Sequence, residues 1–224
     1  RENLNMKKRT KWICMILTVI MLFMLSCVGQ AKDINVTKKM SSDAKIKRIT
    51  RLVAYYTDAE VIQRVKKGKT VKEKMDDANI LSMSAYMARS DRKGYQWTKK
   101  EIQKIAYNYF GKKPNVSKIP SYRSAKRRWI SKRFSRWQKK PYVYAGGDWG
   151  CYKPGYNNLK IIQKSSNVYE ISFTNIMGSY ENSKISKKIG TTTFQLKKTG
   201  KSSYGYIITK LQYKGYGLRF SNIR

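Results

Sequence analysis

The segment 123–140, RSAKRRWISKRFSRWQKK, combines basic side chains with tryptophan, and both residue types recognise anionic surfaces. Guanidinium groups form paired hydrogen bonds with phosphate oxygens, and indole rings stack on other rings or lie at membrane interfaces. The segment therefore predicts an anion-binding surface whose candidate residues are Arg127, Arg128, Trp129, Arg133, Arg136 and Trp137. The alternative is a solvated basic sheet edge, where the charges prevent aggregation and the aromatic rings belong to the core.

The conformation of this segment decides which of its side chains share a face. In a helix, Ile130, Phe134 and Trp137 would form the apolar stripe of a membrane-surface helix. In a strand, successive side chains would alternate between two faces. The pattern favours a strand that pairs with Tyr142–Ala145, with the helix as the alternative.

The stretch Tyr144–Tyr156, YAGGDWGCYKPGY, is the second candidate site because glycines surround Asp148 and Trp149. Glycine permits positive φ angles and close backbone approach, which suit a loop that binds an anion or a sugar. Asp148 and Trp149 are therefore candidates for a ligand pocket. The alternative is a tight loop between strands, in which Asp148 accepts hydrogen bonds from backbone amides and Trp149 closes the end of the sheet.

The residue types present argue against most enzyme chemistry. The chain contains no histidine, which excludes a Ser/His triad and a histidine metal site. Only one of the three cysteines, Cys151, lies beyond the N-terminal segment, which is too few for a Cys₄ zinc site. We therefore expect no catalytic, cofactor-binding or metal-binding residues. A carboxylate pair drawn from Asp148, Glu170 and Glu181 leaves a weak glycoside hydrolase as an alternative.

The first 31 residues have the parts of an export signal. Residues 1–5 are expected to be upstream sequence, with Met6 as the start. Basic residues between Lys7 and Lys11 precede the apolar run Trp12–Leu25, and small residues follow it. The run is shorter than the roughly 20 residues that span a bilayer, which leaves an uncleaved anchor as the alternative. The pattern predicts an exported protein, extracellular or on the outer face of the membrane.

Two processing routes compete at the end of this signal. Cleavage after Ala31 would release a soluble protein, and Gly29-Gln30-Ala31 fits the small-residue pattern of a cleavage site. Met24-Leu25-Ser26-Cys27 instead resembles a bacterial lipobox, in which Cys27 would receive lipid and become the first residue. The pattern favours cleavage, and lipidation at Cys27 is the alternative.

The charge of the chain predicts an anionic partner. Lys and Arg number 49 against 13 Asp and Glu, which gives a formal net charge of +36. An exported protein meets no chromosome, so we expect anionic cell-wall polymers or membrane headgroups as partners, with nucleic acid the weaker alternative. Compositional bias toward Lys, Ile, Asn and Tyr also explains part of the charge. The composition therefore favours a non-enzymatic surface protein, with a small-ligand or glycan-binding module near Asp148 as the alternative; its oligomeric state stays open.

The 224 residues, 41% of them hydrophobic, suit one domain after the signal. Residues 32–40 are expected to form a flexible lead-in, and the segment 41–112 to be helical. The expected helices begin at Ser41-Ser42-Asp43 and at three capping boxes, Thr57-Asp58-Ala59-Glu60, Thr70-Val71-Lys72-Glu73 and Thr98-Lys99-Lys100-Glu101. The last helix has the clearest apolar period and is expected to end at Gly111.

Residues 113–224 predict an antiparallel sheet that packs with the helix 98–110 as one domain. Turns at Ser165-Ser166-Asn167 and Thr199-Gly200-Lys201-Ser202 predict two hairpins. One face of these strands is apolar, with Tyr169, Ile171, Phe173, Met177, Phe194 and Leu196. The expected fold class is α+β, with N-terminal helices followed by a curved antiparallel sheet of cystatin or NTF2 type in outline.

Three features together carry a resemblance to known sequences: the leader with its helical front half, the YVYAGGDWG turn, and the tail GTTTFQLKKTGKSSYGYIITKL. In this layout the chain resembles uncharacterised secreted proteins of Gram-positive bacteria. The resemblance covers most of the chain after the signal and implies export. It implies no activity, and no functional residue is inferred from it.

Overall fold

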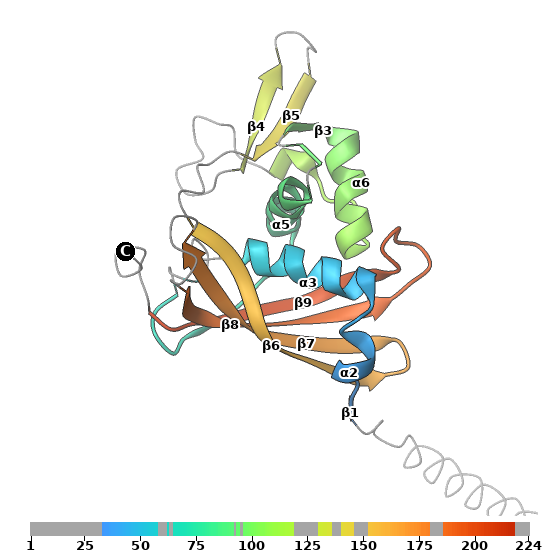
Figure 1. Cartoon of the computed structure of the whole chain (residues 1–224). Coiled ribbons are helices and arrows are strands. Elements are labelled where there is room, and N and C mark those ends of the chain that lie inside the picture. Colours follow the sequence, from blue (N-terminus) through green and yellow to red (C-terminus); the bar gives the residue numbers. More distant parts are fainter. Residues whose placement is uncertain are drawn as a thin grey trace, which may run out of the picture. The chain divides into compact units, whose positions relative to one another are not determined.

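The computed structural model describes residues 33–57, 62, 65–91, 93–94, 96–118, 130–135, 140–145, 152–179 and 186–217 (Figure 1). The residues from Ile34 onward belong to one compact unit. This unit contains helices and a six-stranded antiparallel sheet, four of whose strands (β6 to β9) follow the helices in the sequence, which confirms the α+β class. The finer likeness to a cystatin or NTF2 sheet stays a prediction.

The helices form where local sequence signals begin and end them. They are α2 (Thr37–Met40), α3 (Ala44–Tyr56), α5 (Asp77–Ser90) and α6 (Lys99–Phe110), followed by the short 3₁₀ helix η1 (Val116–Lys118). Asp43 begins α3, because its carboxylate accepts hydrogen bonds from the backbone N–H groups of Lys45 and Ile46. Thr98 and Glu101 form the capping box of α6, and Gly111 ends that helix at a φ of 68°. These starts at Asp43 and Thr98 confirm two of the predicted helices.

The predicted helix start at Thr70 is wrong. Thr70–Lys72 is strand β2, which pairs with the edge of β9 (Tyr206–Gly215). α5 begins at Asp77 instead, and the preceding residue Asp76 accepts a hydrogen bond from the backbone N–H of Asn79 at 2.9 Å. The capping-box pattern is a local signal, whereas the edge of β9 offers backbone hydrogen bonds that suit the β-branched Thr-Val pair.

Two further predictions concern the N-terminal half, namely a flexible lead-in at residues 32–40 and a helix that begins at Thr57. The residues expected to form a flexible lead-in contain strand β1 (Ile34–Asn35), which pairs with β6 (Tyr152–Ser165), and then α2. The Thr37 side chain holds this segment to β6, because its Oγ1 accepts a hydrogen bond from the backbone N–H of Ile161 at 2.8 Å. The helix expected from Thr57 falls largely on residues 58–61 and 63–64, which lie outside the described residues.

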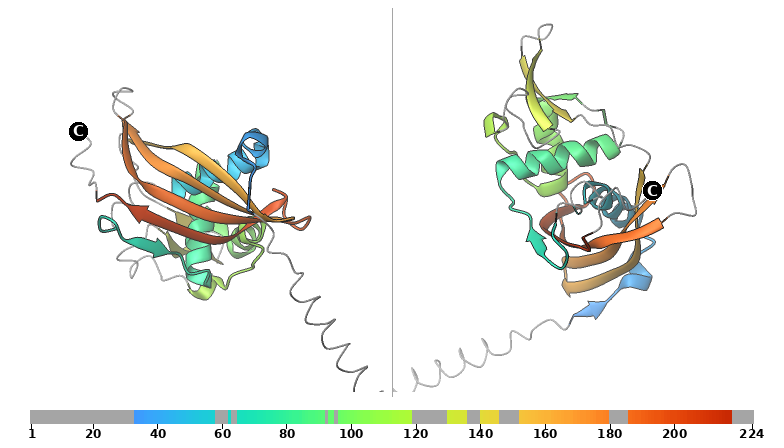
Figure 2. Two further views of the ribbon diagram at one scale, coloured as in Figure 1. Left: turned by 90° about the horizontal axis from the view of Figure 1, so that it is seen from below. Right: turned by 90° about the vertical axis from the view of Figure 1, so that its left-hand side faces the viewer.

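The larger sheet has the strand order β1-β6-β7-β8-β9-β2, and all of its pairs are antiparallel. Its remaining strands are β7 (Val168–Ser179) and β8 (Ser186–Lys198). The two predicted hairpins join β6 to β7 and β8 to β9. Helices α3, α5 and α6 lie on one side of this sheet, and α3 runs along it (Figures 1 and 2).

A second, three-stranded sheet has the order β3-β5-β4. Its strands are β3 (Gln96–Thr98), β4 (Ile130–Ser135) and β5 (Lys140–Ala145). β4 pairs antiparallel with β5, with Arg133 opposite Tyr142. The strand interpretation of the basic segment is therefore confirmed for residues 130–135, but this hairpin belongs to a separate sheet.

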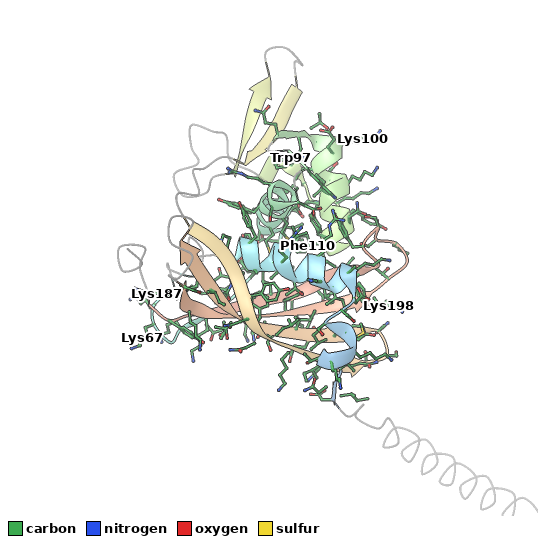
Figure 3. The ribbon with its side chains drawn as sticks, viewed as in Figure 1. Lys67, Trp97, Lys100, Phe110, Lys187 and Lys198 are labelled. Carbon is green, nitrogen blue, oxygen red and sulfur yellow. The ribbon has the colours of Figure 1, made fainter. Side chains whose placement is uncertain are left out.

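The main core lies between the helices and the six-stranded sheet. The predicted apolar face is confirmed, because Tyr169, Ile171, Phe173, Met177, Phe194 and Leu196 are all buried. The expected cover was the helix 98–110, which is α6, and α3 also contributes Ile46, Ile49, Leu52 and Val53 to the same buried cluster. Trp97 and Phe110 lie among the packed elements, while lysines such as Lys67, Lys100 and Lys198 project outward (Figure 3).

Candidate functional site

A pocket of about 1090 Å³ lies between α3, the end of α5 and strand β6. One wall is the outward face of α3, with Lys47, Arg48, Arg51 and Tyr55. Ser90 and Asp91 at the end of α5 form the second wall. The third is Pro154–Tyr156 of β6, on a stretch that β1 does not cover, where proline is tolerated. The small side chains of Ala44 and Ala54 leave room between these walls.

The helical repeat explains why the cations of α3 gather in this pocket. Lys47, Arg51 and Tyr55 follow one another at intervals of four residues, which places them on one face of the helix about 6 Å apart along its axis. The opposite face of α3 is buried against the core. Burial of that apolar face therefore fixes the direction in which the three polar side chains point.

The pocket has more positive than negative charge. Lys47 and Arg51 are exposed, and neither forms an ion pair with a carboxylate in the described part of the chain. Arg48 and Asp91 are paired with each other. Three cations therefore face one carboxylate, and this arrangement is suited to binding an anion.

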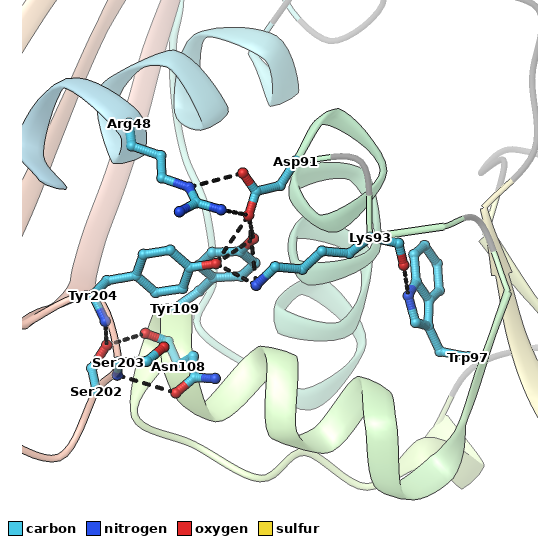
Figure 4. A network of polar contacts seen from close by, with 9 residues as sticks. All are labelled: Arg48, Asp91, Lys93, Trp97, Asn108, Tyr109, Ser202, Ser203 and Tyr204. Atoms are coloured by element: carbon cyan, nitrogen blue, oxygen red, sulfur yellow. Dashed lines mark hydrogen bonds and ion pairs between the residues drawn. The ribbon is translucent and has the colours of Figure 1, made fainter. Parts of the chain in front are cut away.

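Asp91, which lines the pocket, forms the centre of a polar cluster (Figure 4). Arg48 donates from Nε to Oδ1 at 2.9 Å and from Nη2 to Oδ2 at 2.7 Å. The Tyr204 hydroxyl donates to Oδ2 at 3.0 Å, and Lys93 Nζ lies 3.5 Å from the same oxygen. The Asp91 side chain is only 3% exposed, so these groups replace the water that the carboxylate loses.

The cluster joins elements that are distant in the sequence. Tyr109 of α6 stacks on Tyr204, with ring centroids 5.1 Å apart, and its hydroxyl lies 3.4 Å from Asp91 Oδ2. Lys93 donates a hydrogen bond to the Tyr204 hydroxyl and lies over both tyrosine rings. Nearby, Ser202 donates to the backbone carbonyl of Asn108 at 2.6 Å (Figure 4). These contacts hold α3, α5, α6 and the β8–β9 connection together.

Opposing effects set the pKa values in this cluster. Burial alone would raise the pKa of Asp91, but hydrogen bonds from Arg48 and Tyr204 and the charges of Arg48 and Lys93 lower it below its ordinary value. The hydrogen bond to Asp91 raises the pKa of Arg48, against the effect of burial. Burial raises the pKa of Tyr109, and its hydrogen bond with Tyr204 adds to the shift. The cluster therefore holds a charged Arg48–Asp91 pair beside a neutral Tyr109.

Tyr156 lies in the wall opposite α3, and contact with a core residue fixes its ring. Its ring packs on Phe173 with a centroid separation of 5.2 Å. Burial raises the pKa of the Tyr156 hydroxyl, and the nearby charge of Arg51 opposes that shift. Directly after Tyr156, β6 has a bulge between Asn157 and Lys160, where Asn158 adopts a φ of 52°. Bulges of this kind re-aim neighbouring side chains and are frequent beside binding sites.

The site differs from the residues proposed from sequence. Of the anion-binding candidates, Arg133 lies on β4, and Arg127, Arg128, Trp129, Arg136 and Trp137 lie outside the described residues. Asp148, Trp149 and Cys27 lie outside them too. These candidates stay predictions. The four-residue spacing of Lys47 and Arg51 on a capped helix was a signal for the pocket, whereas no sequence pattern links Arg48 to Asp91.

Comparisons with known proteins add no family to this description. No protein family model matches the chain, and neither a curated protein nor a solved structure matches it significantly. Within the described residues, aspartates and glutamates form no cluster of three or more that could hold a metal ion. Among the same residues, the helices are too short or too polar to cross a membrane.

Proposed function

We propose that the protein is an exported, strongly basic and non-enzymatic surface protein that binds the anionic groups of cell-wall polymers or membrane headgroups. The pocket between α3 and β6 is the part of the molecule that performs this binding. The observation that supports the proposal most directly is the pair Lys47 and Arg51, which are exposed, share one helix face and have no carboxylate partner in the described part of the chain.

The roles of the carboxylates support this proposal. Asp43, Asp76 and Glu101 accept hydrogen bonds from backbone N–H groups at helix starts. Asp91 pairs with Arg48, and Glu73 accepts hydrogen bonds from the hydroxyls of Tyr56 at 3.0 Å and Tyr213 at 2.8 Å. These five carboxylates therefore stabilise the fold itself. Lys47 and Arg51, which pair with none of the five, are left to interact with charges supplied by a ligand.

Sedimentation with purified cell walls tests the proposal. We expect the protein to bind walls in about 0.01 M salt, where the Debye length is about 30 Å, and to be released near 1 M, where it is about 3 Å. The double variant Lys47→Gln/Arg51→Gln should bind at least about tenfold more weakly, since two phosphate contacts are lost. The matched control Lys99→Gln/Lys100→Gln removes the same charge from exposed positions on α6 outside the pocket.

The outcomes separate specific from general binding. Equal losses in the two double variants would contradict the pocket, because they would indicate attraction to the whole basic surface. No binding at low salt would contradict the proposal altogether. A parallel measurement with anionic phospholipid vesicles distinguishes wall polymers from headgroups as the source of the anionic groups.

A further inference from the structure

The pocket is much larger than a single anion requires. Its volume of about 1090 Å³ slightly exceeds the range of about 300–1,000 Å³ that is usual for sites that bind whole organic molecules. Its walls also contain the rings of Tyr55 and Tyr156 and the Pro154–Gly155 backbone, which extend the pocket beyond its cations. These features indicate a ligand with an anionic group and a larger uncharged part.

The charges of the pocket indicate which anionic group it binds. Asp91 already accepts hydrogen bonds from Arg48 and Tyr204, so it neutralises Arg48 and is not free to bind a ligand hydroxyl. Three cations facing one carboxylate leave two positive charges in excess. A phosphate monoester carries a charge of about −1.5 to −2 near pH 7, which matches that excess better than a single carboxylate does.

The tyrosines indicate the uncharged part of the ligand. Tyr55 lies one turn beyond Arg51 on α3, and Tyr156 lies on β6 close enough to Arg51 for that charge to affect its pKa. Both side chains are half-buried, and each presents a ring beside a hydroxyl. A saccharide combines an apolar C–H face with several hydroxyl groups, which is the combination that such amphipathic rings contact well.

We infer that this pocket binds a phosphorylated saccharide, with its phosphate on Lys47 and Arg51 and its sugar ring against Tyr55 and Tyr156. The inference rests on the proposed function and names its ligand class. Arg48 contributes through Nη1, since its Nε and Nη2 are occupied by Asp91. Asp91 thus acts as a positioning residue that fixes the orientation of the Arg48 guanidinium group.

Calorimetric titration of the full chain with four probes tests the inference. The probes are glucose 1-phosphate, glucose, inorganic phosphate and adenosine 5′-phosphate. We expect glucose 1-phosphate to bind about tenfold tighter than inorganic phosphate or glucose, because only it fills both parts of the pocket. Adenosine 5′-phosphate, which offers a flat base in place of the sugar hydroxyls, should bind more weakly than glucose 1-phosphate.

Substitutions then test which residues bind the phosphate and which bind the sugar ring. Arg51→Gln should weaken glucose 1-phosphate and inorganic phosphate by a similar factor of about ten. Tyr55→Leu should weaken glucose 1-phosphate severalfold and leave inorganic phosphate unchanged. Tyr156→Phe keeps the packing on Phe173 and removes only the hydroxyl, so it gives a second readout in a variant that retains the core contact.

Three outcomes would overturn the inference. They are equal affinity for glucose 1-phosphate and inorganic phosphate, tighter binding of adenosine 5′-phosphate, and unchanged sugar-phosphate affinity in both tyrosine variants. The wall assay keeps this failure distinct from that of the proposed function. If Lys47→Gln/Arg51→Gln still lowers wall binding, the anion site stands and only the saccharide part is wrong.

Discussion

Helix α3 is held by two polar networks that differ in charge and in access to solvent. At its C-terminal end, Thr57, Asn175 and Thr192 form a neutral network that is almost completely buried. Nearer its N-terminal end, Arg48 joins the charged cluster around Asp91, and the Arg48 side chain is 46% exposed. The neutral network is closed and serves only the fold. The charged cluster is partly exposed through Arg48, and this exposed side chain lines the pocket.

The neutral network satisfies its own hydrogen-bonding groups. The side-chain amide of Asn175 donates to the Thr57 carbonyl at 2.8 Å and to Thr57 Oγ1 at 3.0 Å. The Thr192 hydroxyl donates to Asn175 Oδ1 at 2.7 Å, and the Thr57 hydroxyl donates to the Val53 carbonyl at 2.8 Å. Because water does not reach these groups, loss of one member leaves buried partners without a hydrogen bond.

The largest expected effect comes from breaking the neutral network. Asn175→Leu should lower the free energy of unfolding by about 2–4 kcal/mol, because the Thr57 carbonyl and the Thr192 hydroxyl would both lose a partner in the core. Denaturant unfolding measures the change. Thr193→Val on the neighbouring, partly exposed position of β8 is the control and should stay within about 0.5 kcal/mol. Equal effects of the two substitutions would contradict the assignment of this network as the anchor of α3.

A smaller effect is expected from the charged cluster. Asp91→Asn should cost about 1–2 kcal/mol, less than the 3–5 kcal/mol of a fully buried pair, because the exposed sides of Arg48 and Lys93 regain water. Unfolding at neutral pH measures it, with Glu170→Gln on β7 as a control of equal charge change. If Asp91→Asn lowered the free energy of unfolding as much as Asn175→Leu, the charged cluster would be as inaccessible to water as the neutral network.

The pH dependence separates the two networks further. The pKa of Asp91 is lowered in the folded chain, so its contribution is present above the unfolded value of about 3.9 and is lost as the pH falls through the folded value. The stability difference between the natural chain and Asp91→Asn should be constant from about pH 7 to 5 and shrink below about pH 4. The effect of Asn175→Leu should show no such change, because its network contains no titrating group. If the effects of Asp91→Asn and Asn175→Leu both shrank in acid, the distinction between a titrating charged cluster and a neutral network would be wrong.

The contrast between local and distant contacts also explains what the sequence could predict. The starts of α3 and α6 depend on neighbouring residues, such as Thr98 and Glu101, and both were found from the sequence. The apolar face of β7 and β8 follows from alternation within each strand. The Thr70 box was misinterpreted because pairing with β9 decided its conformation.

The candidate site was harder to predict because distant segments build it. Arg48 and Asp91 are 43 residues apart, and Tyr204 lies 113 residues beyond Asp91. No spacing rule relates such residues, and their contact depends on how the helices pack on the sheet. Lys47 and Arg51 could have been found by their four-residue spacing, but the denser charge at 123–140 was the stronger signal.

The smallest expected effect on stability is at the pocket cations. Lys47→Gln and Arg51→Gln should each change the free energy of unfolding by less than about 0.5 kcal/mol, and toward greater stability, because each removes from a chain of net charge +36 a charge that has no ion-pair partner in the described residues. Arg48→Gln should instead destabilise by about 1 kcal/mol, since it breaks the pair with Asp91. Denaturant unfolding of the three variants compares adjacent cations of one helix. A loss above about 1 kcal/mol at Lys47 or Arg51 would give that residue a structural role, and the pocket would then have no free cation there for a phosphate.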